Sequence, residues 1–165
     1  MRLHIGDDIS GTAWTAGTPR GSAFPASWLV WPMWSERNEK MERTEKAVEY
    51  KHNGYNCCQA VLAAYADELG LPEETLKRIG AAFGSGMGGM EGTCGALCGA
   101  EMVLGLRDYG GGPMHSAAKA MYESFREKSG AAICKELKGI GTGKVLCSCD
   151  DCVRHGMEVV MEVQV

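Results

Sequence analysis

Residues 83–99 read FGSGMGGMEGTCGALCG, and the rest of the chain is organised around this glycine-rich stretch. Seven of its seventeen residues are glycine, so the backbone turns sharply here or lies very close to a neighbouring segment. The residues that follow predict a helix, which places Cys94 at or just inside a helix N-terminus with Thr93 as its N-cap. The dipole of that helix favours the thiolate of Cys94. A flexible loop leading into a helix with two inert core cysteines, Cys94 and Cys98, explains the same stretch.

The composition indicates a single globular domain. The chain has 165 residues, of which 45% are hydrophobic and 23% charged, enough for a core that is stable without cross-links. Its net charge of -4 gives no general attraction to nucleic acid. No apolar run approaches the roughly 20 residues that a membrane-spanning helix needs. We therefore expect neither nucleic-acid binding nor membrane insertion.

Cysteine is the residue type that most directly suggests chemistry. The chain has eight cysteines in four separated groups, as a single site built from several helices would require. Without a convincing signal peptide the expected location is the reducing cytoplasm, where such cysteines indicate metal or redox chemistry more often than structural disulfides. The cysteines are Cys57, Cys58, Cys94, Cys98, Cys134, Cys147, Cys149 and Cys152.

The chain divides into two parts by sequence character. Residues 1–35 contain all four tryptophans, interleaved with Gly, Ser, Thr and Pro, and lack a helical period. We expect a poorly ordered extension over residues 1–40 and a cysteine-rich helical redox domain over residues 41–165.

Hydrophobic periodicity predicts an all-α fold, a compact bundle of about six helices with Gly-rich connecting loops. Asn56 is a natural N-cap for the second helix, and Gly70 closes it. A short helical turn surrounds Cys134. The valine-rich end of the last helix could instead pair as a strand. The predicted helices cover residues 36–51, 56–69, 72–83, 93–107, 113–130 and 147–163.

Short sequence elements surround the cysteines in a fixed order over residues 41–160. They read GYNC at 54–57, QAV at 59–61, TCGA at 93–96, LGL at 104–106 and CKEL at 134–137, followed by Cys149 and Val153. In number and order they resemble the C_GCAxxG_C_C family, whose members are taken to be redox-active. The chain reads Cys-Gly-Ala where the family label has Gly-Cys-Ala. Because Cys147 and Cys152 lie close by, the register of the last cysteine stays open.

The resemblance implies four functional cysteines: Cys57, Cys94, Cys134 and Cys149. Two of them, Cys57 and Cys94, fall near predicted helix N-termini, where the residues alone predict a lowered thiol pKa. Lys135 and Lys138 would favour ionisation of Cys134 if they face it. A small buried core residue is the alternative role for Cys134.

The last cysteine group reads CSCDDC over residues 147–152. This spacing could supply two or three ligands to one metal ion. Asp150 and Asp151 raise the pKa of neighbouring thiols, which argues against an exposed nucleophile here unless a cation intervenes. A solvated helix start, with both carboxylates favoured by the helix dipole, explains the group equally well.

Three functions fit these observations. The preferred hypothesis is thiol–disulfide redox chemistry centred on Cys94, paired reversibly with Cys57 or Cys134, which would make the chain a thiol–disulfide oxidoreductase. An electron-transfer protein is the alternative, with Cys57, Cys94, Cys134 and Cys149 holding an iron–sulfur cluster or another metal such as zinc. A non-catalytic helical interaction module is the third. The sequence names neither a cofactor nor a redox partner protein, and the Ala/Gly-rich helix after Cys94 permits a homodimer.

Overall fold

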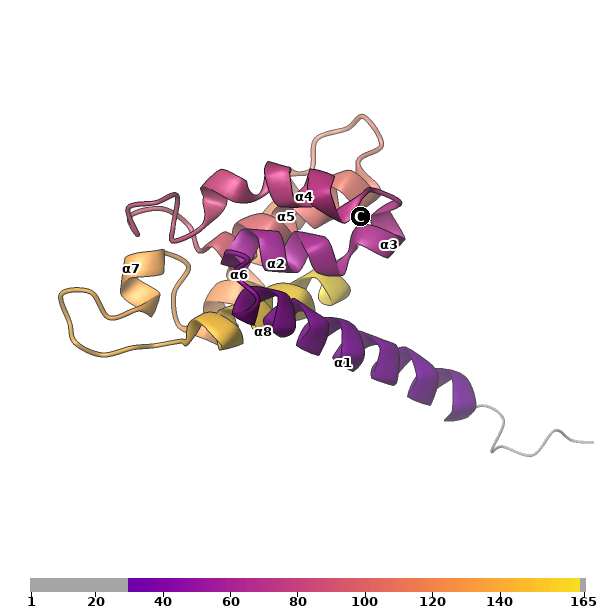
Figure 1. Ribbon diagram of the computed structural model, residues 1–165, viewed down its shortest axis with the longest axis horizontal. Helices are drawn as coiled ribbons and strands as arrows, with labels where there is room; N and C mark the ends of the chain where they lie inside the picture. Colours follow the sequence, from indigo (N-terminus) through magenta and orange to yellow (C-terminus); the bar gives the residue numbers. More distant parts are fainter. Residues whose placement is uncertain (1–29, 164–165) are drawn as a thin grey trace, which may run out of the picture.

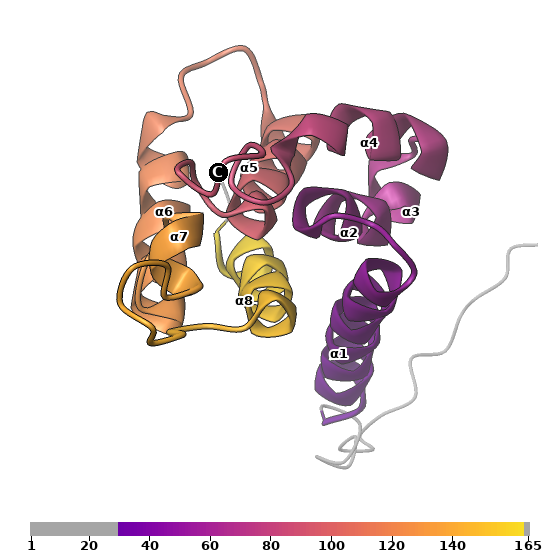
Figure 2. The same ribbon diagram turned by 60° about the vertical axis from the view of Figure 1, so that its left-hand side comes forward.

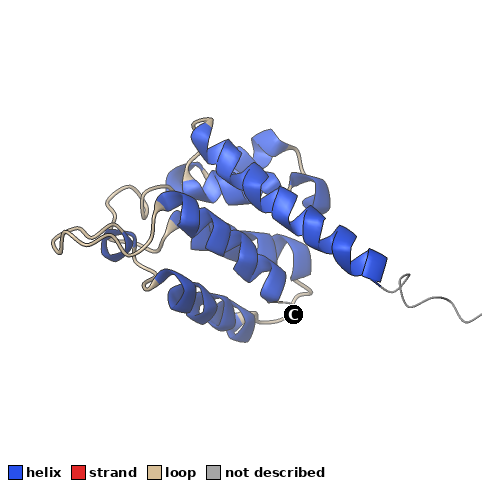
Figure 3. Ribbon diagram, turned by 90° about the horizontal axis from the view of Figure 1, so that it is seen from below, coloured by secondary structure: helices blue, strands red, loops and turns tan. Residues whose placement is uncertain are grey.

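The computed structural model describes residues 30–163, and the regular secondary structure of this part of the chain consists of helices joined by loops (Figures 1 and 3). Between residues 30 and 163 the strand-like geometry is limited to one isolated antiparallel bridge, Thr93 to Ile133. The predicted all-α class is therefore confirmed. The elements are α1 (Val30–His52), α2 (Cys57–Ala64), α3 (Ala66–Leu69), α4 (Glu73–Ile79), the 3₁₀ helix η2 (Ala81–Phe83), α5 (Gly95–Asp108), α6 (His115–Ser129), α7 (Cys134–Leu137) and α8 (Cys149–Glu162).

The number and bounds of the helices differ from the prediction of about six. The described residues form eight α-helices, because the segment predicted over residues 56–69 divides and α7 counts separately. That division occurs at Tyr65, whose backbone leaves the helical region (φ -104°, ψ 10°). The valine-rich end of α8 is helical and does not pair as a strand. Residues 1–29 of the predicted extension lie outside the described residues, and residues 30–40 belong to α1.

Local sequence signals set several helix ends. The Asn56 side chain accepts a hydrogen bond from the backbone of Gln59, and the Gln59 side chain accepts one from the backbone of Asn56, both at 2.9 Å. This reciprocal cap fixes the start of α2. Gly70 and Gly130 end α3 and α6 in the left-handed conformation that glycine adopts at low cost.

The core is formed where α5 packs against α2 and α8. Figure 2 shows α8 between α6 and α1, both of which pack against it. Small residues of α5 allow close packing within the chain, since a Cβ atom at Gly99 would lie 2.8 Å from the carbonyl oxygen of Cys58. The fully buried side chains around this contact include Leu62, Leu97, Phe125 and Met157.

The glycine-rich loop over residues 84–92 is tied to the segment before α7. The backbone N–H of Cys134 donates to the carbonyl of Gly92 (3.0 Å), and that of Cys94 donates to the carbonyl of Ala132 (2.8 Å). At the left of Figure 1 this loop lies beside α7, at the end of the molecule where α8 begins. The chain thereby gathers several cysteines at one end of the bundle.

Candidate functional site

Cysteine side chains from three helix N-termini form two hydrogen-bonded pairs. The outer pair is Cys57, the first residue of α2, with Cys149, the first residue of α8. The inner pair is Cys94, the N-cap of α5, with Cys152 in the first turn of α8. Positions three apart face the same side of a helix, so Cys149 and Cys152 hold the two pairs next to each other. All eight cysteines are free thiols in this structure.

The two pairs differ in exposure. Both members of the outer pair are partly exposed. In the inner pair, Cys94 is 2% exposed and Cys152 is fully buried. A large external reagent therefore meets the outer pair first.

Cys94 is stabilised as a thiolate by a neighbouring thiol and, as the sequence predicts, by its position at a helix start. A hydrogen bond from the Cys152 thiol lowers the pKa of Cys94 against the opposing effect of burial, and the backbone N–H groups of Ala96 and Leu97 lower it further. The predicted N-cap, Thr93, is wrong by one residue. Cys94 itself has the non-helical backbone of an N-cap (φ -54°, ψ 130°), because α5 begins only at Gly95.

Cys149 is also stabilised as a thiolate, and the cations that the sequence requires for a nucleophile beside Asp150 and Asp151 are present. A hydrogen bond from the Cys57 thiol is the largest cause that lowers the pKa of Cys149, and the charges of Lys138 and Lys51 lower it further. Burial acts in the opposite direction but is outweighed. The neighbouring carboxylate of Asp150 is compensated, since it forms an ion pair with Lys51 at 3.2 Å.

Cys57 does not have the lowered pKa that the sequence predicts, and the two lysines that could favour ionisation of Cys134 do not give it a lowered pKa. The pKa of Cys57 is raised, because its thiol donates to Cys149 and is largely buried. The pKa of Cys134 is raised by burial and by the charge of Cys94, which together outweigh Lys138. Lys135 does not help, because its ammonium group pairs with Glu91.

Lys138 contacts one cysteine of each pair. The Nζ atom of Lys138 donates to the carbonyl of Cys147 at 2.8 Å and contacts the Sγ atom of Cys152 at 3.5 Å. It also hydrogen-bonds with Cys149. A positive charge between the two pairs stabilises whichever sulfur atoms are ionised.

The sequence did not predict that Cys152 is the hydrogen-bond partner of Cys94 or that Cys147 contacts Cys152. The thiol of Cys152 also hydrogen-bonds with Cys147, whose Sγ atom lies 3.8 Å from Nδ1 of His155. The signal for Cys152 was present as the three-residue spacing from Cys149 at a predicted helix start.

The two remaining cysteines, Cys58 and Cys98, are core residues. The Sγ atom of Cys58 contacts the sulfur of Met102 at 3.8 Å, and that of Cys98 contacts the carbonyl of Thr93 at 3.9 Å. Burial raises the pKa of Cys58 to about 12 and that of Cys98 to about 11. Both thiols stay protonated at neutral pH.

Two glycines let the backbone approach the cysteines closely. A Cβ atom at Gly95 would lie 2.6 Å from the carbonyl oxygen of Phe83 and 3.5 Å from Cβ of Cys57. One at Gly86 would lie 2.6 Å from Cβ of Cys134, and Gly86 also has a positive φ of 56°. Both positions therefore require glycine.

A metal centre would need several ligand-type side chains around one point. Over residues 30–163 no group of three or more His, Cys, Asp or Glu side chains is placed to hold a metal ion. The four cysteines that the family resemblance implies do not all contact one another. Cys57 and Cys149 share a hydrogen bond, whereas the hydrogen-bond partner of Cys94 is Cys152.

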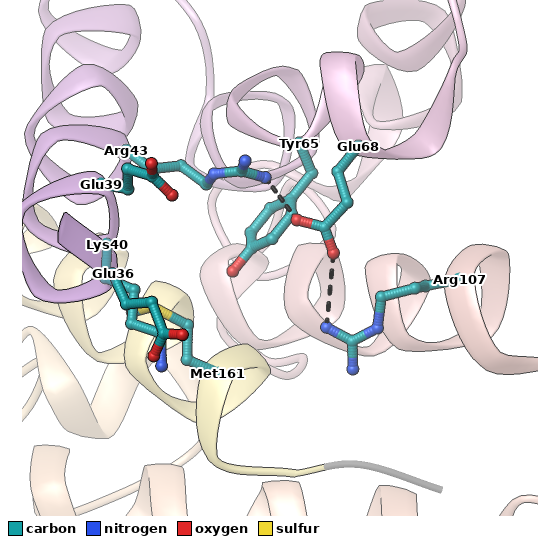
Figure 4. Close-up of a pocket in the computed structure, with 8 residues that line it drawn as sticks. All are labelled: Glu36, Glu39, Lys40, Arg43, Tyr65, Glu68, Arg107 and Met161. Carbon is teal, nitrogen blue, oxygen red and sulfur yellow. Dashed lines mark hydrogen bonds and ion pairs between the residues drawn. The ribbon is translucent and has the colours of Figure 1, made fainter. Parts of the chain in front are cut away.

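A separate polar pocket of about 240 Å³ lies away from the cysteines. In Figure 4, Arg43 lies over the ring of Tyr65 and pairs with Glu68, which also faces Arg107. The Tyr65 hydroxyl is buried and has no hydrogen-bond partner among the described residues. The pocket is lined by Glu36, Glu39, Lys40, Arg43, Tyr65, Glu68, Arg107 and Met161.

A helical bundle that pairs cysteines at helix N-termini defines a cysteine-rich redox protein. The chain belongs to the C_GCAxxG_C_C family, since the model of that family, described as "Putative redox-active protein (C_GCAxxG_C_C)", matches residues 55–163. The resemblance found in the sequence is thereby confirmed. Comparison with curated proteins and with solved structures finds no match. Among the described helices, none combines the length and apolar character needed to cross a membrane.

Proposed function

We propose that the chain carries out thiol–disulfide exchange through the outer pair, with Cys149 as the attacking thiolate and Cys57 as the resolving thiol. One observation carries the proposal: a partly exposed cysteine at a helix start accepts a hydrogen bond from a second thiol and lies beside Lys138. Thiolate character and access together determine the reactivity of a cysteine.

This proposal moves the attacking role from Cys94 to Cys149. Both sulfur atoms are stabilised as thiolates, but Cys94 is only 2% exposed. A disulfide must reach its attacker along the S–S axis, so a buried thiolate reacts slowly with an external substrate. Its greater exposure therefore favours Cys149 as the thiolate that attacks the substrate.

The reaction with a disulfide RS–SR′ then has two steps. The Cys149 thiolate attacks one sulfur, forms the mixed disulfide Cys149–SR, and releases R′S⁻, which takes a proton from solvent. Cys149 has now lost its negative charge, and with it the hydrogen bond that chiefly raises the pKa of Cys57. Cys57 gives its proton to solvent, attacks Sγ of Cys149, and releases RS⁻. Two electrons pass from the dithiol to the substrate, and the Cys57–Cys149 disulfide remains.

Regeneration requires a second redox protein or small dithiol that returns two electrons to the Cys57–Cys149 disulfide. A reducing compartment such as the cytoplasm supplies such donors and keeps the thiols free between cycles.

The test uses the full-length reduced protein and oxidised glutathione. After acid quenching and alkylation, peptide mass spectrometry should find the Cys57–Cys149 linkage. The Cys149→Ser variant should lose reduction of glutathione disulfide, whereas the matched Cys98→Ser variant, which alters a core thiol outside the pairs, should retain it. Unchanged activity in Cys149→Ser would overturn the proposal.

The same protein purified anaerobically distinguishes this function from a metal–thiolate centre. Iron and zinc analysis with visible absorption spectroscopy should find no stoichiometric metal. One iron–sulfur cluster or one zinc ion per chain, lost on replacing Cys57 or Cys149, would support the electron-transfer alternative instead.

A further inference from the structure

We propose that the inner pair, Cys94 and Cys152, exchanges electrons with the outer pair, so that the chain stores four electrons in two dithiols and delivers them through Cys149. This inference rests on the proposed function, because the outer pair is the point at which a substrate disulfide enters.

Two hydrogen bonds and one close backbone approach connect the four cysteines. Cys152 hydrogen-bonds with Cys94, and Cys57 hydrogen-bonds with Cys149. The two pairs meet between Cys94 and Cys57: the charge of Cys94 acts on Cys57, and the Cβ position of Gly95, the residue after Cys94, is 3.5 Å from Cβ of Cys57. A relay from Cys152 through Cys94 and Cys57 to Cys149 therefore needs only contacts between neighbours.

The inner pair is more than two buried cysteines. Cys58 and Cys98 are also buried, yet each contacts a group that cannot form a disulfide, a methionine sulfur and a backbone carbonyl. The inner pair instead joins one thiol to another, beside the ammonium group of Lys138 at 3.5 Å from Cys152. A buried pair reacts only slowly with an external disulfide. Exchange with the adjacent outer pair would connect it to such a substrate.

The exchange begins when the outer pair has become the Cys57–Cys149 disulfide. The Cys94 thiolate attacks Sγ of Cys57, the Cys94–Cys57 bond forms, and Cys149 leaves as a thiolate. Cys149 is the better leaving group of the outer pair, since Lys138 and Lys51 stabilise its anion.

The second step completes the transfer. Cys152 loses its proton and attacks Sγ of Cys94, the Cys94–Cys152 bond forms, and Cys57 leaves and takes up a proton. The inner pair has lost two electrons and the outer pair has gained them, with no net change in protons. The outer dithiol is then ready to reduce a second substrate disulfide.

The test counts thiols and maps linkages in the fully reduced, full-length protein treated with excess oxidised glutathione. The parent protein should lose four of its eight thiols and contain both Cys57–Cys149 and Cys94–Cys152. The Cys94→Ser variant should lose two thiols and contain only the outer linkage. In Cys149→Ser, formation of the inner linkage should slow at least about tenfold, because the entry point is gone. The Cys98→Ser control should behave as the parent.

Each other outcome contradicts part of the scheme. If the parent forms the outer linkage alone, or joins Cys152 to Cys147, the relay is wrong and the proposed function stands. If the inner linkage forms in Cys149→Ser at the parental rate, it is oxidised directly and the relay is wrong. If neither linkage forms, the relay and the proposed function both fail.

Discussion

Lys138 places one positive charge against both cysteine pairs. Replacing it with methionine should raise the pKa of Cys149 by about one unit, since a nearby cation favours the thiolate. At a pH below the parental pKa, the thiolate fraction and the rate of alkylation should then fall about tenfold. In the parent, reactivity should persist as the pH falls and be lost only below the lowered pKa of Cys149. The rate measured by mass spectrometry at Cys149 across pH checks this.

Lys135 provides the matched control for this substitution. It lies in the short helix α7, three residues before Lys138, which is the C-cap of that helix, but its ammonium group pairs with Glu91 at the surface. Lys135→Met should therefore leave the pH profile of Cys149 unchanged. Equal shifts in both variants would mean that net charge, and not the contact made by Lys138, controls the thiol.

Tyr65 carries a buried hydroxyl that finds no partner among the described residues. Tyr65→Phe keeps the ring, over which Arg43 lies at 4.8 Å, and removes the unsatisfied oxygen. The free energy of unfolding in urea should rise by about 1 kcal/mol.

Tyr55→Phe is the control, and it should change the free energy of unfolding in the opposite direction. The Tyr55 hydroxyl donates to Glu73, so its removal should lower the free energy of unfolding by about 1 kcal/mol. A loss of stability in Tyr65→Phe as well would show that its hydroxyl is bonded in solution.

The residues adjacent in sequence predict the direction of the pKa shift for Cys94 but not for Cys149. The helix start visible in the sequence accounts for part of the thiolate character of Cys94, but the largest cause is the hydrogen bond from Cys152, which the fold supplies. For Cys149 the adjacent Asp150 was misleading, because this carboxylate faces Lys51 and His52. The cations that act on Cys149 come from α1 and from the residue that follows α7, and only the fold brings them there.

Gly95 and Gly105 lie on the same helix, α5, and should respond to alanine in opposite ways. A Cβ atom at Gly95 would lie 2.6 Å from a carbonyl oxygen of η2 and 3.3 Å from the backbone nitrogen of Cys58, so α5 would have to move away from α2. Gly95→Ala should cost about 2 kcal/mol of stability. Gly105 has nothing within 4 Å of that position. Gly105→Ala should stabilise the helix by up to about 1 kcal/mol.

Urea denaturation with peptide mapping checks both variants. In Gly95→Ala the displaced helix start should also slow formation of the Cys94–Cys152 linkage, whereas Gly105→Ala should leave it unchanged. A Gly95→Ala variant as stable as the parent would show that α2 and α5 can separate without loss.

Element boundaries were predictable where a local signal sets them. Asn56 with Gln59 marks the start of α2, and Gly70 marks the end of α3. The break at Tyr65 has no such signal, because an aromatic residue is acceptable inside a helix. In the structure the Tyr65 side chain lines the pocket near α1. The start of α1 at Val30 was missed because tryptophans and a proline hide its helical period.

At the scale of the whole molecule, the sequence predicted that the cysteine groups converge but not how they pair. Cys94 was expected to meet Cys57 or Cys134, and its hydrogen-bond partner is Cys152. The partner depends on the angle at which α8 crosses α5, which the side-chain packing of both helices determines. No spacing along the chain encodes that angle.

Oxidation of the outer pair should stabilise the entire bundle. A disulfide between Cys57 and Cys149 would join the start of α2 to the start of α8 across most of the chain. For so long a loop the chain-entropy model gives about 4 kcal/mol, equivalent to about 10 °C in melting temperature. The Cys94→Ser background isolates this linkage, and melting followed by circular dichroism with and without dithiothreitol measures it. Adding Cys149→Ser should abolish the difference. Equal melting temperatures in the Cys94→Ser background would mean that the linkage does not form, or that it strains the junction of α2 and α8 by as much as it restrains the unfolded chain.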